Sequence, residues 1–276
     1  MKSPRVGKTP FLLNTPHRPL AGFPLAFSHR GFAPAGEENT VKAFTAATEL
    51  GFGYLETDVH ATRDGVLVAF HDEDLVRLTG DPRRVRDCTA AELAELRVAG
   101  EPIPTFEELL ESFRSARFNV DIKAGPAAEL MAETLVRHRA ADRVLLGSFN
   151  GSRRHMASRL LAADDRTHQL ATSPGIIGVG AAVLIGAVAP LPRAVYGSFA
   201  ALQVPETHGK LRVVTPRFIQ RAHDASLQVH VWVVNDAPAM HRLLDMGVDG
   251  IMTDAAPTLA AVMSERGHWP QNSLTR

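Results

Sequence analysis

Four short motifs along the chain carry side chains suited to acid–base and phosphate chemistry. The groups in them that could act together are two imidazoles, one guanidinium, one ammonium group and three carboxylates, and each motif lies at or near the end of an apolar run. An imidazole transfers protons near neutral pH, and a guanidinium offers an anion a fork of hydrogen-bond donors. In chain order the motifs are Ser28-His29-Arg30-Gly31, Tyr54-Leu55-Glu56-Thr57-Asp58-Val59, Phe70-His71-Asp72 and Asn119-Val120-Asp121-Ile122-Lys123.

The spacing of the acidic residues indicates a bound cation. Alternate residues of a β-strand face the same side, so Glu56 and Asp58 project into one space. By the same argument, Asp121 shares a face with Lys123. Neighbouring carboxylates repel each other unless a proton or a cation lies between them. Oxygen ligands favour Mg²⁺ or Ca²⁺ over zinc, while a solvent-facing acidic edge and a simple Asp121–Lys123 ion pair are the alternatives.

The combined motifs predict metal-assisted cleavage of a phosphate ester. One of the two histidines, His29 and His71, would take a proton from the attacking hydroxyl, and the other would protonate the leaving group. The motifs do not assign these two roles. Arg30 and Lys123 would supply positive charge for an anionic substrate.

The elements that must position these motifs alternate between strands and helices. We expect strands over Leu25–Ser28, Tyr54–Val59, Val66–Phe70, Phe118–Ile122, Val144–Gly147, His168–Ala171, Ala201–Val204, Val229–Val234 and Gly250–Met252. Between most of them the pattern predicts helices over Thr40–Leu50, Thr105–Ser115, Ala127–Arg139, Gly151–Leu161, Thr215–Ala225 and Ala237–Met246. This alternation, with no break in composition, predicts one domain built on a parallel sheet.

A (β/α)8 TIM barrel is favoured over an open sheet. No glycine-rich phosphate loop follows the first strand, and the chemical residues recur at the carboxyl ends of several strands. The nine expected strands are one too many for a barrel. The link His60–Gly65 is too short for a crossover and ends in an Asp-Gly turn signal. Val66–Phe70 is therefore predicted to form a hairpin-like extension after the second strand.

Composition narrows the classes of partner and site. The 276 residues include 30 Lys+Arg and 30 Asp+Glu, so no overall charge attracts nucleic acid or an anionic membrane surface. Apolar residues make up 45% of the chain, enough for a full core. A single cysteine, Cys88, excludes an internal disulfide and a cysteine-based zinc cluster.

The ends of the chain and one internal segment lie outside this pattern. We expect a flexible leader over residues 1–24, the barrel over 25–264 and a polar, fraying tail over 265–276. The leader lacks the long apolar run of a signal peptide, which predicts a cytoplasmic protein. The uncharged segment Gly175–Leu191 is predicted to be a buried helix, with membrane contact as the less favoured alternative.

Taken in order, these motifs resemble those of the glycerophosphodiester phosphodiesterase family. The resemblance spans residues 28–254, nearly the whole predicted barrel. It rests on His29-Arg30-Gly31, Glu38-Asn39-Thr40, Glu56-x-Asp58, Asp64-Gly65, His71-Asp72, Asp121-Ile122-Lys123, Val231-Trp232-Val233-Val234-Asn235 and the run Gly247–Asp254.

The resemblance implies a (β/α)8 barrel that hydrolyses a small-molecule glycerophosphodiester to glycerol 3-phosphate and an alcohol. It also implies one divalent cation, Mg²⁺ or Ca²⁺, with Mn²⁺ as a third option. The positions that match the family's pattern are the acid/base pair His29 and His71, the metal ligands Glu56, Asp58 and Asp121, the phosphate contacts Arg30 and Lys123, and the substrate-pocket residues Glu38 and Trp232.

The chain departs from the family's pattern at one metal-ligand position, and the same motifs are compatible with two other functions. Asp121 stands where the family usually has Glu, so its carboxylate reaches less far and the affinity or choice of metal is expected to change. The first rival is a lysophospholipase D acting on single-chain phospholipids, in which Gly175–Leu191 lines an acyl groove. The second is a non-catalytic barrel that binds phosphodiesters, against which the retention of His29 and His71 argues.

Overall fold

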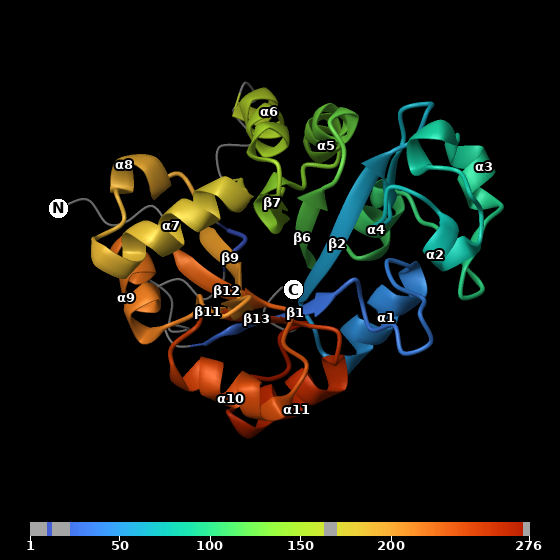
Figure 1. Ribbon diagram of the computed structural model, residues 1–276. Helices are drawn as coiled ribbons and strands as arrows, with labels where there is room; N and C mark the ends of the chain where they lie inside the picture. Colours follow the sequence, from blue (N-terminus) through green and yellow to red (C-terminus); the bar gives the residue numbers. More distant parts are fainter. Residues whose placement is uncertain (1–9, 13–22, 163–169, 273–276) are drawn as a thin grey trace.

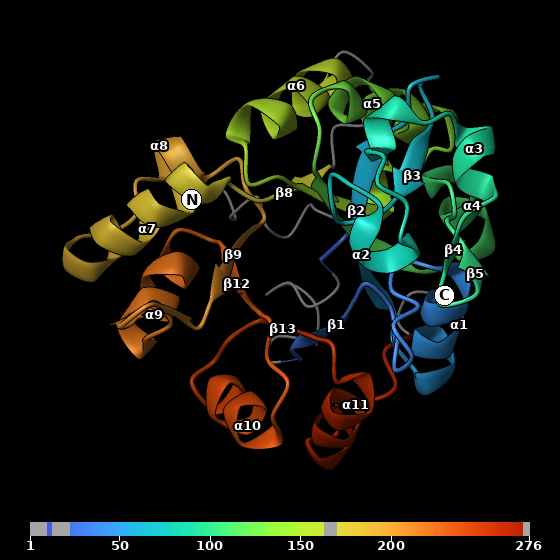
Figure 2. The same ribbon diagram turned by 45° about the vertical axis from the view of Figure 1, so that its right-hand side comes forward.

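Parallel strands surround a central axis and helices cover their outer side (Figures 1 and 2). The computed structural model describes residues 10–12, 23–162 and 170–272. Hydrogen-bonded neighbours follow the order β8-β7-β6-β2-β1-β13-β12-β9. The strands of this sheet are β1 (Leu25–His29), β2 (Tyr54–Ala61), β6 (Arg117–Ile122), β7 (Val144–Gly147), β8 (Ala171–Thr172), β9 (Ala201–Pro205), β12 (Gln228–Trp232) and β13 (Gly250–Thr253). The predicted single-domain (β/α)8 barrel is confirmed.

The helices that follow the strands lie close to their predicted positions. Those that cover the barrel are α1 (Val41–Leu50), α4 (Phe106–Ser112), α5 (Pro126–Arg137), α6 (Gly151–Ala162), α7 (Ile176–Val188), α9 (Pro216–Asp224), α10 (Ala237–Asp245) and α11 (Ala256–Glu265). The sequence pattern did not predict α11 or the short helix α8 (Arg193–Tyr196). The strand expected over His168–Ala171 falls partly outside the described residues.

The barrel is nearly closed, and its seam lies between β8 and β9. In the described part of the chain these two strands form no ladder, although the Ala200 N–H donates to the Thr172 carbonyl across the seam (2.8 Å). Helices α7 and α8 connect the two strands. The least regular part of the wall therefore lies across the barrel from β1 and β2.

The predicted hairpin-like extension is also confirmed. Strand β3 (Leu67–Ala69) pairs antiparallel with β2, with Val59 opposite Ala69. The chain then continues through short elements: α2 (Val76–Thr79), the 3-10 turn η2 (Val85–Asp87), α3 (Ala90–Ala94), β4 (Arg97–Val98) and β5 (Glu101–Pro102). These elements enclose a small core of their own that includes the free, buried Cys88. The remaining short elements are the 3-10 turn η3 (Ala141–Arg143), β10 (Thr207–His208) and β11 (Leu211–Arg212).

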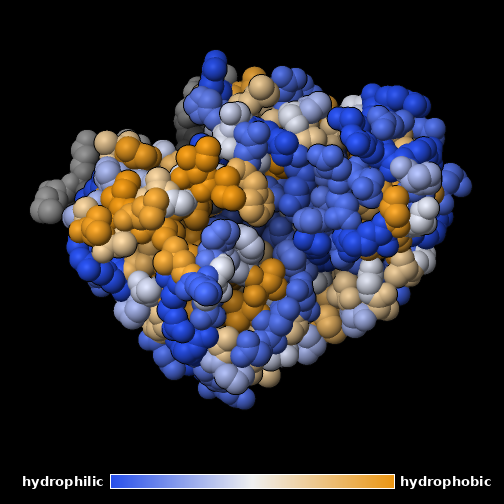
Figure 3. Space-filling view, in the orientation of Figure 1, coloured by the Kyte–Doolittle hydropathy of each residue, from blue (hydrophilic) through white to orange (hydrophobic). Residues whose placement is uncertain are grey.

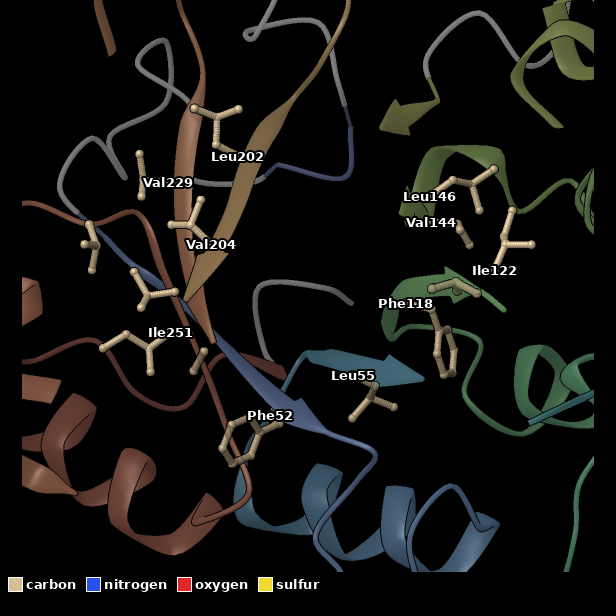
Figure 4. Packing of buried hydrophobic residues seen from close by; sticks show 14 of the residues in the cluster. Phe52, Leu55, Phe118, Ile122, Val144, Leu146, Leu202, Val204, Val229 and Ile251 are labelled. Atoms are coloured by element: carbon tan, nitrogen blue, oxygen red, sulfur yellow. The ribbon is translucent and has the colours of Figure 1, made fainter. Parts of the chain in front are cut away.

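The main hydrophobic layer lies between the strands and the surrounding helices. In β2, Leu55 and Val59 face this layer, as do Leu202 and Val204 of β9 (Figure 4). Because side chains alternate along a strand, the residues between them face the barrel axis. Burial of the outward-facing residues therefore fixes which side chains point inward.

A second apolar cluster fills the amino-terminal end of the barrel. Within the predicted leader, Phe11 and Leu12 are buried there, and the Tyr54 hydroxyl donates to the Phe11 carbonyl (2.7 Å). The described part of the predicted tail is packed rather than frayed. Gln271 is fully buried and bonds the backbone at Pro24 (2.7 Å), and the Trp269 indole bonds the Leu50 carbonyl (3.1 Å).

The segment Gly175–Leu191 is helical, but the prediction that it is buried is wrong. Within α7 only Ala182 and Gly186 are buried, whereas Ile177 and Val188 are 86% and 77% exposed. The small residues form the contact surface, and α7 packs mainly on α9 through it. The larger aliphatic side chains are left on the outer side. None of the helices in the described ranges is long and apolar enough to cross a bilayer.

Candidate active site

The carboxyl ends of the strands open into a cavity of about 590 Å³. This is the end of a barrel where active sites are built. Its charged side is lined by His29, Arg30, Glu56, Asp58, His71, Asp121 and Lys123. Its apolar side is lined by residues that include Phe149, Ile176, Val179, Val183, Leu184, Leu211 and Trp232. All four predicted motifs thus meet in one cavity.

The turn after β1 explains why a glycine follows His29 and Arg30. Arg30 and Gly31 have φ angles of 54° and 83°, in the left-handed region that favours glycine. A Cβ on Gly31 would lie 2.7 Å from Ala43, so only glycine fits against α1. The turn places the Arg30 backbone N–H on the Glu56 carboxylate (3.2 Å).

The three residues before α1 each support this turn. The Glu38 carboxylate accepts from the Arg30 guanidinium (3.0 Å). The Asn39 amide donates to Asp58 (3.3 Å), and Thr40 caps α1. Among the described residues that line the cavity, Glu38 does not appear: its carboxylate lies on Arg30 and on Arg77 of α2. Glu38 thus orients Arg30 from behind the cavity wall.

The acidic residues lie side by side on β2 and β6. Asp58 and Asp121 are direct partners in the parallel pairing of the two strands. Lys123 Nζ bridges them, at 2.9 Å from Asp58 and 2.7 Å from Asp121. Arg30 Nε lies 3.2 Å from Asp58 on its other side. The Asp58 carboxylate is buried, yet Lys123 and Arg30 outweigh that burial and lower its pKa.

Glu56 holds a proton more readily than an ordinary carboxyl group. Burial and the neighbouring charge of Asp58 raise the pKa of Glu56 to about 7. Burial therefore keeps Glu56 partly protonated near neutral pH, whereas Lys123 and Arg30 keep its neighbour Asp58 ionised.

Both histidines are anchored by a carboxylate through Nδ1. His29 Nδ1 donates to Asp254 (2.6 Å), and His71 Nδ1 donates to Asp72 (2.6 Å). In each ring this leaves Nε2 as the nitrogen that can exchange protons with a substrate. Burial alone would lower the pKa of His29, but Glu56 and Asp254 outweigh it and raise that pKa.

The donor set fits a hard cation. In the described part of the chain no three acidic, thiol or imidazole groups form a ready-made metal cluster. However, Oδ1 of Asp121 is buried without a hydrogen-bond donor, whereas Oδ2 contacts Lys123 Nζ at 2.7 Å. The three neighbouring carboxylates are those of Glu56, Asp58 and Asp121, and Glu56 holds a proton near neutrality. Carboxylate oxygens are the ligands that a hard divalent cation prefers.

The apolar side of the cavity comes from later strands and from α7. Trp232, at the end of β12, packs edge-to-face on Phe149 with ring centroids 5.9 Å apart. Phe149 also lies 5.4 Å below Lys123 Nζ, so it joins the charged and apolar sides. Sequence reasoning identified Trp232 but missed Phe149, which follows β7.

Two further residues stand in the predicted motifs but received no role there. Asp254 ends the Gly247–Asp254 run, and Asp72 directly follows His71. A signal was present for both, because each carboxylate follows the carboxyl end of a barrel strand or of the hairpin. The pairing of Asp254 with His29 depends on the barrel bringing β1 beside β13, whereas Asp72 is the chain neighbour of His71.

Comparisons with known proteins show the family of the chain. Residues 29–258 match the glycerophosphoryl diester phosphodiesterase family. The Mycobacterium tuberculosis protein named probable glycerophosphodiester phosphodiesterase 2 is 41% identical over 256 residues, covering 89% of this chain and 92% of that protein. Human lysophospholipase D GDPD1 is 26% identical and covers 82% of each chain.

A solved structure shares the fold. The structure of an Oleispira antarctica phosphodiesterase in complex with the product sn-glycerol-3-phosphate superposes with a TM-score of 0.70 at 22% identity. The match covers 88% of this chain and 98% of that one. The barrel, the cavity and these similarities lead to one conclusion: the chain belongs to the glycerophosphoryl diester phosphodiesterase family and is a phosphoric diester hydrolase.

Proposed function

We propose that the protein hydrolyses glycerophosphodiesters to glycerol 3-phosphate and an alcohol, using His29 and His71 for proton transfer. The observation that carries this proposal is the pair of carboxylate-anchored imidazoles facing the same cavity as three acids and two cations. The family match and the names of the relatives support the substrate class.

In the proposed reaction, water adds to phosphorus and the phosphorus–oxygen bond to the alcohol breaks. Nε2 of one histidine takes the proton from water, and Nε2 of the other gives a proton to the leaving oxygen. Asp254 and Asp72 hold the two rings in the tautomer that this requires. Arg30 offsets charge that develops on the phosphate oxygens, and Glu38 holds the guanidinium in place.

We assign the cation to Glu56, Asp58 and Asp121. When bound, Mg²⁺, Ca²⁺ or Mn²⁺ would act as a Lewis acid on the phosphate. Lys123, which neutralises Asp58 and Asp121 here, would then be available for the phosphate. The expected cytoplasmic location stays a prediction.

The test is release of glycerol 3-phosphate from glycerophosphocholine and glycerophosphoethanolamine. The protein would be stripped with EDTA and then supplied with Mg²⁺, Ca²⁺ or Mn²⁺ in turn. We expect release only with a cation, and loss of release in His29→Asn but not in His155→Asn, a change at an exposed histidine of α6. Absence of release from these substrates and from lysophospholipids, with every cation, would contradict the proposal.

A second candidate is lysophospholipase D activity on single-chain phospholipids. The observation that favours it is the apolar side of the cavity, where Val179, Val183 and Leu184 of α7 continue the wall beyond Trp232. An acyl chain has a place to lie there, whereas a free choline or ethanolamine gains little from it. Relative turnover of lysophosphatidylcholine and glycerophosphocholine, below the micelle-forming concentration, distinguishes the two substrates.

A further inference from the structure

An exposed apolar surface extends outward from the apolar side of the cavity. It consists of Ile176, Ile177, Leu184 and Val188 of α7 and Val195 of α8, which are all more than half exposed. Figure 3 shows hydrophobic residues gathered over these two helices. We name this set the α7 face. Single exposed aliphatic residues are common on proteins, but a contiguous patch marks an interaction site.

The α7 face is continuous with the cavity. Ile176 and Leu184 belong both to this exposed surface and to the cavity lining. A protein seated on the α7 face would therefore cover part of the cavity's mouth. A lipid surface seated there would instead place amphiphilic phosphodiesters at that mouth.

The charges around the α7 face suit an anionic surface. No residue from Gly175 to Pro192 is charged. The surrounding stretch 170–224 contains five basic residues, Arg193, Lys210, Arg212, Arg217 and Arg221, against the two acids Glu206 and Asp224. Glu206 is neutralised by Arg242 at 2.9 Å. Basic residues beside an apolar helix attract the headgroups of anionic lipids.

A second element at the cavity mouth repeats this pattern. The antiparallel pair β10–β11 carries Leu211, which is 52% exposed and lines the cavity. Lys210 and Arg212 flank it and are both exposed. An aliphatic tip between two cations can enter a lipid interface while its neighbours contact phosphate groups.

We propose that the α7 face docks on an anionic lipid surface, with α7 lying along the interface and Lys210 and Arg212 contacting headgroups. This docking concerns the location of the protein at a membrane surface, not the bond that is hydrolysed at the site. It also explains why α7 exposes aliphatic residues that a barrel does not need for its core.

The test is co-sedimentation of the protein with vesicles of phosphatidylglycerol and phosphatidylcholine in equal parts. We expect the double variant Ile177→Asp/Val188→Asp to bind these vesicles about tenfold more weakly than the wild type. Neither residue lines the cavity, so hydrolysis of glycerophosphocholine should be unchanged. An uncharged pair, Ile177→Ser/Val188→Ser, should weaken binding in the same direction.

The matched control is Met156→Asp/Leu160→Asp on α6. These side chains are 45% and 48% exposed, and the pair adds the same two negative charges away from the cavity lining. It should bind vesicles within about twofold of the wild type. Wild-type protein that does not bind, or α7 variants that bind as well as it does, would overturn the proposal.

A third result would also overturn it. If ultracentrifugation found a wild-type dimer that Ile177→Asp/Val188→Asp dissociates, the α7 face would be a contact between copies of this chain. Vesicle binding needs no catalysis, so the outcome is independent of the proposed reaction. Binding without release of glycerol 3-phosphate would leave the docking surface in place and remove only the proposed function.

Discussion

The two sides of the cavity are built on different physical principles. On the charged side, β1, β2 and β6 present groups that contact each other closely, as in the Arg30–Asp58–Lys123–Asp121 chain of ion pairs. On the apolar side, α7 presents aliphatic groups that are open to solvent. The first side is organised before a substrate arrives, whereas the second gains free energy only when something covers it. The difference assigns chemistry to one side and association to the other.

The largest effect should come from the two histidines of the charged side. His29→Ala and His71→Ala should each lower kcat by about 10²-fold or more, because each removes one proton carrier. Circular dichroism and the melting temperature should stay close to wild type, since both side chains face the cavity. Steady-state release of glycerol 3-phosphate measures the effect. Near-wild-type rates in both variants would remove the acid/base assignment.

Local sequence was a good guide to the charged side. Each of its motifs lies within a strand or directly after one, and the alternation of Glu56 and Asp58 with Leu55 and Val59 fixed their direction. The barrel itself followed from the same alternation of strands and helices. What could not be read were the links between distant segments, such as His29 with Asp254, because these depend on which strands become neighbours.

The apolar side shows where sequence reasoning fails in principle. An uncharged segment is ordinarily buried, so the prediction for Gly175–Leu191 followed the general rule. Burial depends on which face of a helix its neighbours cover, and α9 covers the face with Ala182 and Gly186. The position of α7 beside the seam between β8 and β9 leaves the opposite face uncovered. Composition alone contains no information about that seam.

The metal ligands should give the next largest effect. Glu56→Gln should raise the half-saturating concentration of the activating cation about tenfold or more, because it removes a negative charge from the ligand set. Activation curves on EDTA-stripped protein measure it, with Glu111→Gln at an exposed position of α4 as the charge-matched control. An unchanged curve for Glu56→Gln would count against this ligand.

Asp121→Glu tests the same side in the opposite direction. The longer side chain gives the carboxylate more reach within the cavity that Asp121 shares with Asp58, and should tighten cation binding by a few-fold. Isothermal titration with Mg²⁺ and Ca²⁺ measures the change without relying on turnover. Weaker binding in this variant would mean that the pocket is already adapted to the shorter acid.

A moderate and selective effect is expected from the apolar side. Leu184→Ser should lower kcat/KM for lysophosphatidylcholine about fivefold, because a partly covered aliphatic side chain contributes roughly 1 kcal/mol. Glycerophosphocholine turnover should hardly change, since Leu184 belongs to the apolar side of the cavity and lies on α7, not on the strands that carry the charged groups. Leu160→Ser on α6 is the matched control. Equal losses on both substrates would mean that the apolar side of the cavity does not act on acyl-chain binding alone, contrary to our inference.

The smallest effect concerns an ion pair on α9, the helix that packs against α7 of the apolar side. His223, on the helix α9 that carries α7, bonds Asp249 at 2.7 Å, and this hydrogen bond raises the pKa of His223. A raised pKa means that the folded state binds the proton more tightly than the unfolded state. The added stability is therefore fully present below about pH 6.5, the ordinary histidine pKa, and is lost as the pH rises through the folded pKa. Because the side chain is 37% exposed, the contribution should stay below about 1 kcal/mol.

Urea unfolding of wild type and His223→Gln at pH 5.5 and pH 8.5 would measure this contribution. The wild type should exceed the variant in free energy of unfolding by more at the lower pH. A difference that grows toward the higher pH would show that the pair does not stabilise α9 through the protonated imidazole. In that case packing alone would hold the helices of the apolar side in place, and the apolar side would differ even more from the charged side, which is held by ion pairs.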